Sequence, residues 1–316
     1  MRPSILLIGT TGQLGRELDA MLPRVGEVTS LDRQHLDLGK PEEIRSAIRS
    51  CRPALIVNAA AHTAVDKAES EEEAARAINT DAVALMAEEA KKIGASLIHY
   101  STDYVFDGTK ATPYDENDPT NPLNVYGRTK LEGERAIQAS GVSHLIFRTT
   151  WVYGTQGKNF LLTILRLATQ REELRIVRDQ IGAPTLSGEI ARASTRIIEQ
   201  LSAGDRGMFS LAEVSGIYHM TGGGATSWAD FAAAILEEAA MAPAGLPWLA
   251  SATNNLPLIA RRIVPIPASE YPTPARRPAY SVLSNARLGR TFSLQLPEWR
   301  KQLHSIFAPH DNSTRP

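Results

Sequence analysis

The chain has 316 residues, of which 43% are hydrophobic and 22% charged, and its formal net charge at pH 7 is -1. Values this close to the averages of globular proteins argue against a disordered or fibrous chain and predict a folded core. Because there is no net positive charge and no run of Lys or Arg, nucleic acid is not an expected partner.

The N-terminal segment has only a short apolar run, residues 5–8, before Gly9. This run is too short for the core of a signal peptide or for a membrane span. The single cysteine, Cys51, cannot form an internal disulfide, which fits a reducing compartment. We therefore expect a cytoplasmic protein with no membrane partner, in which Cys51 is structural.

Short aliphatic runs alternate with longer amphipathic stretches in the first half of the chain. This alternation is typical of βαβ units on a parallel sheet. The sequence predicts an α/β fold with a Rossmann-type, doubly wound parallel sheet. The expected strands and helices are, respectively, residues 5–8, 55–57, 97–100 and 145–147, and residues 41–49, 71–93 and 125–139.

A glycine-rich turn follows the first expected strand. Gly9, Gly12 and Gly15 have GxxGxxG spacing, and a helix begins within the motif. These glycines allow a tight turn, the approach of the backbone to a pyrophosphate, and close packing of helix on strand. Glycines can also occupy such a turn without any ligand, but the position after the first strand favours a dinucleotide.

Two residues after the second expected strand give opposite indications about the cofactor. Asp32 suits the ribose diol of NAD, whereas Arg33 suits the additional phosphate of NADP, and both residues can also be solvated turn residues. Asp37 and Leu38 are candidates for the adenine end of the cofactor. After the third expected strand, small residues at 59–61 would let the backbone lie against the cofactor.

Tyr126 and Lys130 lie four residues apart at the start of an expected helix, so both face the same side. A lysine in this position can lower the pKa of the tyrosine and hold the nicotinamide ribose, while the phenol donates a proton to a developing alkoxide. Thr102 ends the fourth expected strand and would bind the substrate oxygen beside Tyr126. The YxxxK spacing alone is common, but together with the glycine turn and Thr102 it predicts reduction of a ketone.

The pattern loosens after about residue 151, and prolines are frequent between 265 and 278. We expect residues 1–150 to form an NAD(P)-binding domain. Residues 151–309 would mainly form a smaller C-terminal substrate-binding lobe, partly interleaved with the first domain. Residues 310–316 would be a disordered tail.

Four segments carry a resemblance to a known family: residues 59–69 (AAAHTAVDKAE), 100–106 (YSTDYVF), 122–127 (PLNVYG) and 271–278 (YPTPARRP). With the motifs above, they make the chain resemble the dTDP-4-dehydrorhamnose reductases of the extended short-chain dehydrogenase/reductase superfamily over nearly its whole length. The resemblance implies reduction of the C4 ketone of dTDP-4-dehydro-6-deoxy-L-mannose to dTDP-L-rhamnose, a precursor of surface polysaccharides. It also implies use of either NADPH or NADH.

The resemblance assigns roles to individual residues. Tyr126 would be the proton donor, Lys130 its partner and cofactor anchor, and Thr102 the group that binds the reacting oxygen. The sugar would contact Val65, Asp103 and Trp151. The cofactor would contact Gly12, Gln13, Leu14, Asp37, Leu38, Ala61, His62, Thr63 and Tyr100, although His62 taken alone is more often structural.

Further expectations concern charged residues. Arg276 and Arg277 could present guanidinium groups to a diphosphate, or could belong to a solvated loop. Some members of the family bind Mg²⁺ at a homodimer contact through carboxylates that correspond here to Glu17, Glu189 and Glu298.

Two alternatives stay open. One is a regulatory subunit that binds NADP without turnover, although an intact Thr102, Tyr126 and Lys130 argue against it. The other is a different nucleotide-sugar reductase or an epimerase on the same fold. The related dehydratases resemble this chain less, because they place a glutamate after the Thr-Asp pair where this chain has Tyr104.

Overall fold

The computed structural model describes residues 2–202 and 209–308, so the tail expected to be disordered lies outside the described residues. Its centre is a six-stranded sheet in the order β10-β5-β4-β3-β1-β2, and every neighbouring pair is parallel. This confirms the expected doubly wound sheet. The strands are β1 (Ser4–Ile8), β2 (Glu27–Leu31), β3 (Leu55–Asn58), β4 (Ser96–Thr102), β5 (His144–Thr149) and β10 (Gly216–His219).

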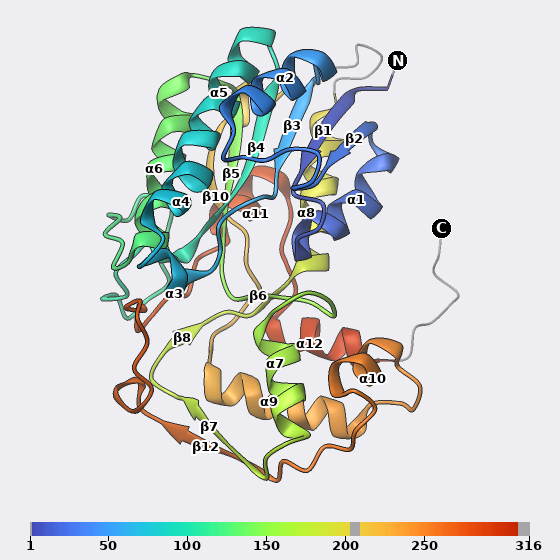
Figure 1. The fold of residues 1–316 in the computed structure, drawn as a ribbon, viewed down its shortest axis with the longest axis vertical. Coiled ribbons are helices and arrows are strands. Elements are labelled where there is room, and N and C mark those ends of the chain that lie inside the picture. The colour runs from blue at the N-terminus through green and yellow to red at the C-terminus, as the bar shows by residue number, and fades with distance from the viewer. Residues whose placement is uncertain (1, 203–208, 309–316) are drawn as a thin grey trace.

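Helices cover both faces of this sheet (Figure 1). One face carries α2 (Pro41–Cys51), α5 (Ala82–Ile93) and α6 (Val125–Ser140), and the other carries α1 (Gln13–Met21), α8 (Ser187–Leu201) and α11 (Ala286–Phe292). Both α8 and α11, like β10, come from the second half of the chain. Their position on the first sheet favours the interleaving of the two lobes that we propose.

The segment 71–93, expected to be one helix, is divided into three parts. They are α4 (Glu72–Arg76), a π-helical turn η2 (Ala77–Asp81) and α5. Asn79 lies in the π-helical turn and makes two hydrogen bonds with the main chain of His62, at 2.9 and 3.1 Å. A π-helical turn inside a helix is often found at a functional site, and this one holds the loop that follows β3.

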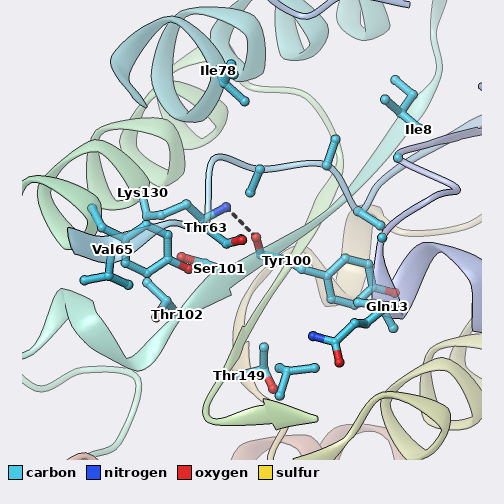
Figure 2. A pocket seen from close by; sticks show the side chains of 18 of the residues that line it. Ile8, Gln13, Thr63, Val65, Ile78, Tyr100, Ser101, Thr102, Lys130 and Thr149 are labelled. Atoms are coloured by element: carbon cyan, nitrogen blue, oxygen red, sulfur yellow. Dashed lines mark hydrogen bonds between the residues drawn. The ribbon is translucent and has the colours of Figure 1, made fainter. Parts of the chain in front are cut away.

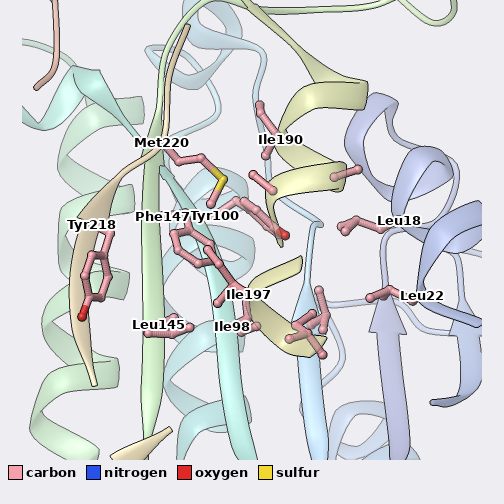
Figure 3. Close-up of a cluster of buried hydrophobic side chains, with 14 of the residues drawn as sticks. Leu18, Leu22, Ile98, Tyr100, Leu145, Phe147, Ile190, Ile197, Tyr218 and Met220 are labelled. Carbon is pink, nitrogen blue, oxygen red and sulfur yellow. The ribbon is translucent and has the colours of Figure 1, made fainter. Parts of the chain in front are cut away.

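The main apolar core lies between the sheet and the helices α1 and α8 (Figure 3). Leu18 of α1, Leu22 directly after it, and Ile190 and Ile197 of α8 pack there against Phe147 of β5. All five side chains are buried. Both faces of the sheet are covered at its centre, and the inner strands β1 and β3 are accordingly almost continuous aliphatic runs, whereas the edge strand β2 is partly exposed.

A smaller lobe lies below the sheet in Figure 1. It has its own apolar cluster, built around Leu161, Phe231 and Leu303. Its elements are α7 (Phe160–Ala168), α9 (Trp228–Met241), α10 (Pro247–Thr253), α12 (Trp299–Phe307), the parallel pair β7 (Glu173–Val177) and β12 (Arg262–Ile266), and the short strands β6 (Val152–Tyr153), β8 (Ile181–Gly182), β9 (Thr185–Leu186) and β11 (Thr226–Ser227).

A buried ion pair joins α6 to β5. The Arg148 guanidinium donates to both carboxylate oxygens of Glu134, at 3.0 and 2.6 Å, and both side chains are almost fully enclosed. This pair ties the helix that carries Tyr126 and Lys130 to the central sheet.

Among residues 2–202 and 209–308, no helix combines the length and the apolar character needed to cross a membrane.

Candidate active site

A cavity of about 540 Å³ opens at the carboxyl ends of β1, β3, β4 and β5 (Figure 2). It lies where the strand order reverses, between β1 and β3, which is where doubly wound sheets bind their ligands. Its volume suits a small-molecule site. Most of the residues expected at the site line it: Gly9, Gly12, Gln13, Leu14, Asp32, Arg33, Asp37, Leu38, Ala61, Thr63, Val65, Tyr100, Thr102, Asp103, Tyr126, Lys130 and Trp151.

The glycine turn leaves room for an anion at one end of this cavity. Gly12 precedes α1, and no side chain caps the first amides of the helix. Free amides at a helix N-terminus attract a phosphate. Gly9 has φ of +93°, a conformation that favours glycine, and a Cβ there would lie 2.7 Å from the Ala60 nitrogen. These features fit a dinucleotide pyrophosphate.

Gly15 does not line the cavity, and its role is packing. A Cβ at this position would lie 2.1 Å from the carbonyl oxygen of Gly9, so α1 can approach the turn only with glycine there. This is the close helix-on-strand packing that the spacing predicts.

Substituting Gly15 with Ala should therefore distort the glycine turn. We expect destabilisation of about 1–3 kcal/mol from overpacking, together with weaker NADPH binding. Thermal unfolding and a fluorescence titration with NADPH measure the two effects. The control is Gly289→Ala in α11, where a Cβ would lie 3.6 Å from its nearest neighbour and should not destabilise the fold. Equal effects of the two substitutions would contradict this role.

Asp32 and Arg33 both line the cavity, beyond β2. One oxygen of the Asp32 carboxylate, Oδ1, accepts hydrogen bonds from the backbone amides of Gln34 and His35, at 2.9 and 3.1 Å, and lies 2.7 Å from His35 Nδ1. The His35 side chain, ahead of the backbone bonds, lowers the pKa of Asp32. The second carboxylate oxygen of Asp32 can accept from a ribose hydroxyl, and Arg33 can bind the additional phosphate of NADPH. The geometry therefore accommodates NADH and NADPH alike.

Thr102, Tyr126 and Lys130 come together at the other end of the cavity. Thr102 ends β4, and its hydroxyl donates to Asp103 at 3.0 Å and accepts from the amide of Tyr104 at 3.1 Å. Tyr126 lies in the first turn of α6, whose N-cap Asn124 accepts from the amide of Gly127 at 2.8 Å.

Helix α6 approaches the chain after β4 very closely at this point. A Cβ on Gly127 would lie 2.2 Å from the carbonyl oxygen of Tyr104. The Tyr104 and Tyr126 rings meet edge to face, with their centroids 5.6 Å apart. This close approach is what places the Tyr126 phenol beside Thr102.

Burial has the largest effect on the pKa values of Tyr126 and Lys130, and the expected acidification of Tyr126 by Lys130 stays a prediction. Burial raises the pKa of Tyr126 to about 12, while the Thr102 hydroxyl lowers it and Asp103 raises it. Burial also lowers the pKa of Lys130 to about 7, against a smaller opposing effect of Glu134. Because Lys130 is almost fully enclosed, burial disfavours its charged form.

Asp103 lies beneath the reacting end of the cavity and is 2% exposed. Its carboxylate accepts from the hydroxyls of Thr102 and Thr150, each at 3.0 Å. Burial raises the pKa of Asp103 to about 6, although hydrogen bonds from Ser281, Thr102 and Thr150 oppose this. A raised pKa means that the folded protein binds this proton more tightly than the unfolded chain does. Protonation of Asp103 therefore stabilises the folded state.

The stability conferred by protonated Asp103 should therefore be complete below pH 3.8 and be lost as the pH rises through about 6. Asp103→Asn, which is neutral at every pH, should resemble the wild type in acid. Above pH 6 it should be more stable by up to about 3 kcal/mol, the free energy of a shift from 3.8 to about 6. Urea unfolding of both proteins at several pH values measures the difference, and a difference independent of pH would contradict it.

Two tryptophans form the wall of the cavity on the side of the smaller lobe. Trp151 and Trp228 stack with ring centroids 3.4 Å apart and an interplanar angle of 6°. Trp151 has φ of +46°, an uncommon conformation for a residue with a side chain, and a Cβ on Gly182 would lie 2.4 Å from its ring. The surroundings therefore fix the position of the Trp151 ring.

A family model described as the RmlD substrate binding domain matches residues 1–311. The chain is 48% identical to a dTDP-4-dehydrorhamnose reductase of Burkholderia thailandensis over 296 residues, which cover 94% of this chain and 95% of the relative. The chain belongs to the dTDP-4-dehydrorhamnose reductase family.

Solved structures of this reductase family have the same fold. The structure of a dTDP-4-dehydrorhamnose reductase from Clostridium acetobutylicum matches with a TM-score of 0.84 and 34% identity, covering 96% of this chain and 98% of the other. The reductase of Bacillus anthracis in complex with NADP matches with a TM-score of 0.82 and 31% identity, covering 97% and 99%.

Three of the candidate site residues, His62, Arg276 and Arg277, lie outside the cavity lining. His62 is held through its main chain by Asn79, which favours a structural role. Arg277 donates to Asp66 at 2.9 Å, and Arg276 is exposed. Neither arginine lines the cavity, and the contact of these residues with a diphosphate stays a prediction.

Three glutamates were expected to hold Mg²⁺, namely Glu17, Glu189 and Glu298. Within a single copy of the chain they do not form a metal site. Among residues 2–202 and 209–308, no three carboxylate, histidine or cysteine side chains are grouped so that they could hold a metal ion. Glu189 pairs with Arg192, and burial raises the pKa of Glu17 although Arg192 lowers it. The dimer contact that the resemblance implies would have to complete such a site.

Sequence reasoning did not identify several lining residues. They include Ser101, Tyr104, Thr150, Lys158 and Trp228. Trp228 is the first residue of α9, and its stacking on Trp151 joins segments far apart in the sequence, so no local pattern indicated it.

Proposed function

We propose that this chain reduces the C4 ketone of dTDP-4-dehydro-6-deoxy-L-mannose to dTDP-L-rhamnose with NADPH or NADH. The observation that carries this proposal is the placement of Thr102, Tyr126 and Lys130 in the same cavity as the glycine turn. The relatives named dTDP-4-dehydrorhamnose reductase support the choice of substrate, and the NADP bound to the Bacillus anthracis reductase supports the choice of cofactor.

In this proposal Tyr126 donates the proton. A bound reduced nicotinamide would supply a hydride to the carbonyl carbon, and negative charge would then develop on the carbonyl oxygen. A phenol whose pKa is raised to about 12 is fully protonated at neutral pH, so it can donate to that oxygen. A proton from solvent then converts the phenolate of Tyr126 back to the phenol after the product leaves.

Thr102 binds the same oxygen. Its hydroxyl carries a single proton, which is directed at Asp103 in the free chain. Turning this proton toward the ketone leaves Asp103 with the hydrogen bond from Thr150. Asp103 can thus lose one donor without being left unpaired in a buried position.

Lys130 is the cofactor anchor. Its Nζ already donates to the carbonyl oxygen of Tyr100 at 2.6 Å (Figure 2), and its remaining hydrogens can reach a ribose hydroxyl in the cavity. The stacked rings of Trp151 and Trp228 provide a flat apolar surface for the sugar or the base, and Val65 adds an apolar contact.

The experiment supplies purified protein with the dTDP-4-keto-6-deoxy-L-mannose intermediate and NADPH or NADH, and follows the loss of reduced nicotinamide absorbance. We expect one cofactor oxidised for each sugar reduced. Net isomerisation without cofactor consumption would indicate an epimerase. Cofactor binding without turnover of any nucleotide sugar would indicate a regulatory subunit.

The homodimer and the cytoplasmic location implied earlier are also proposals. Analytical ultracentrifugation of the purified chain, with and without Mg²⁺, measures the first of them directly.

A further inference from the structure

The segment that joins β6 to α7 reaches from the smaller lobe to the glycine turn. We call this segment, residues 154–159, the strap. Asn159 Nδ2 donates to the side-chain oxygen of Gln13 at 2.7 Å, and Arg16 Nη1 donates to Gln156 Oε1 at 2.8 Å. Gln13 and Arg16 both lie in the first turn of α1. The strap therefore contacts the part of the fold where the cofactor pyrophosphate is expected.

The backbone of the strap lies directly against Gln13. Gly157 has φ of +82°, a conformation that favours glycine, and a Cβ there would lie 3.1 Å from Gln13 Cγ. Asn159 Nδ2 also donates to the carbonyl oxygen of Gly154 at 2.8 Å, so the same amide holds the two ends of the strap together. These contacts fix the strap beside the glycine turn.

Asn159 has a second contact, which begins the next helix. Its Oδ1 accepts from the amide of Leu162 at 3.1 Å, so Asn159 is the N-cap of α7. One side chain thus joins the first turn of α7 to Gln13 in the first turn of α1. The strap is held at its end by both helices.

Lys158 lies in this strap and lines the cavity. In the part of the chain that the structure describes, three cationic side chains line the cavity, namely Arg33, Lys130 and Lys158. Arg33 lies beyond β2, where it can bind the additional phosphate of NADPH, and Lys130 is assigned to the nicotinamide ribose. Lys158 has no role in the reaction as described above, and its neighbours Gly157 and Asn159 place it next to the glycine turn.

The glycine turn alone does not balance the charge of a dinucleotide. A pyrophosphate carries two negative charges, whereas the N-terminus of a helix acts as roughly half a positive charge. The carboxylates of Asp32, Asp37 and Asp103 also line the cavity and repel an anion. A lysine can approach a phosphate as a compact charge on a flexible stem. Lys158 can supply the positive charge that the turn lacks.

We propose that Lys158 binds the pyrophosphate of the nicotinamide dinucleotide and that Asn159 is the positioning residue that holds the strap for this contact. The smaller lobe then contributes to the cofactor site as well as to the sugar site. The proposed sugar substrate also carries a diphosphate, but the contacts of the strap with Gln13 and Arg16 favour the cofactor. The inference deepens the proposed function and rests on it for the choice of ligand.

The first test measures cofactor affinity without turnover. Lys158→Ala should weaken NADPH binding by about tenfold, because it removes one charge-assisted contact. Lys158→Arg keeps the positive charge and should retain most of the affinity. Lys301→Ala removes the same charge from an exposed position of α12, away from the cavity, and should leave the affinity unchanged. Fluorescence titration with NADPH measures all three variants.

Two further ligands identify the group that Lys158 contacts. Adenosine 2′-monophosphate has the adenosine and the additional phosphate of NADPH but no pyrophosphate, and dTDP has the diphosphate of the sugar substrate. We expect Lys158→Ala to bind both as the wild type does, measured by displacement of NADPH and by calorimetry. An unchanged affinity for NADPH, an equal loss for adenosine 2′-monophosphate, or a loss for dTDP in place of NADPH would overturn the proposal. A wild-type protein that does not bind NADPH would contradict the proposed function as well.

Asn159→Ser separates the contact with Gln13 from the helix cap. A serine hydroxyl can still accept at the start of α7, but it is too short to reach Gln13. We expect weaker NADPH binding with nearly unchanged thermal unfolding. In the double variant with Lys158→Ala, the loss of binding free energy should be smaller than the sum of the two single losses, because Asn159 acts through Lys158. Additive losses in the folded double variant would contradict this positioning role.

Discussion

Tyr126→Phe should lose nearly all turnover while NADPH still binds with little change. Removing a general acid typically costs about 10²–10⁴-fold in rate. The phenol makes no hydrogen bond that holds the fold together, and the Phe ring retains the edge-to-face contact with Tyr104. The free energy lost should therefore belong to the transition state and appear in kcat. Steady-state kinetics and a separate NADPH titration measure the two quantities.

Tyr104→Phe is the matched control for this substitution. Its hydroxyl also belongs to the cavity wall, and burial raises its pKa. It does not precede Lys130 by one helical turn, however, and should not deliver the proton. We expect a much smaller loss of kcat. An active Tyr126→Phe enzyme, or equal losses in the two variants, would refute the assigned role of Tyr126.

The second large effect concerns the buried ion pair. Glu134→Gln leaves the Arg148 guanidinium without its carboxylate in a position where only 3% of that side chain is exposed. Removing one partner of a buried pair costs about 3–5 kcal/mol, because the remaining charge is uncompensated. We expect the free energy of unfolding to fall by this amount in urea denaturation.

The control is Glu72→Gln on the protein surface. Glu72 and Arg128 also approach to 2.6 Å, but their side chains are 54% and 47% exposed. An exposed pair contributes about 1 kcal/mol or less. An equal fall in the free energy of unfolding of Glu134→Gln and Glu72→Gln would contradict our interpretation. It would mean that the burial of the pair does not determine the loss of stability.

The parallel sheet could be predicted because its physical cause is visible in the sequence. Strands covered on both faces are continuous aliphatic runs, and β1, β3, β4 and β5 begin and end close to the expected residues. The glycine turn and the Tyr126–Lys130 spacing were equally readable, since each depends on residues close together in the sequence.

Other features depend on contacts between distant segments. The π-helical turn at Ala77–Asp81 does not interrupt the apolar periodicity, so one helix was expected there. The burial of Lys130 and its contact with His99 of β4 depend on segments 31 residues apart, so the spacing of Tyr126 and Lys130 did not indicate them. The ion pair between Arg277 and Asp66 joins residues from opposite halves of the chain, so the sequence did not indicate it.

The most direct measurement of the central claim is the fate of the transferred hydrogen. NADPH carrying deuterium at C4 of the nicotinamide, prepared in each stereochemical form, is incubated with the enzyme and dTDP-4-dehydro-6-deoxy-L-mannose, and the sugar product is examined by NMR. We expect one of the two forms to leave deuterium at C4 of dTDP-L-rhamnose, one atom for each cofactor oxidised. A product without deuterium at C4 from either form would contradict direct hydride transfer to this carbonyl.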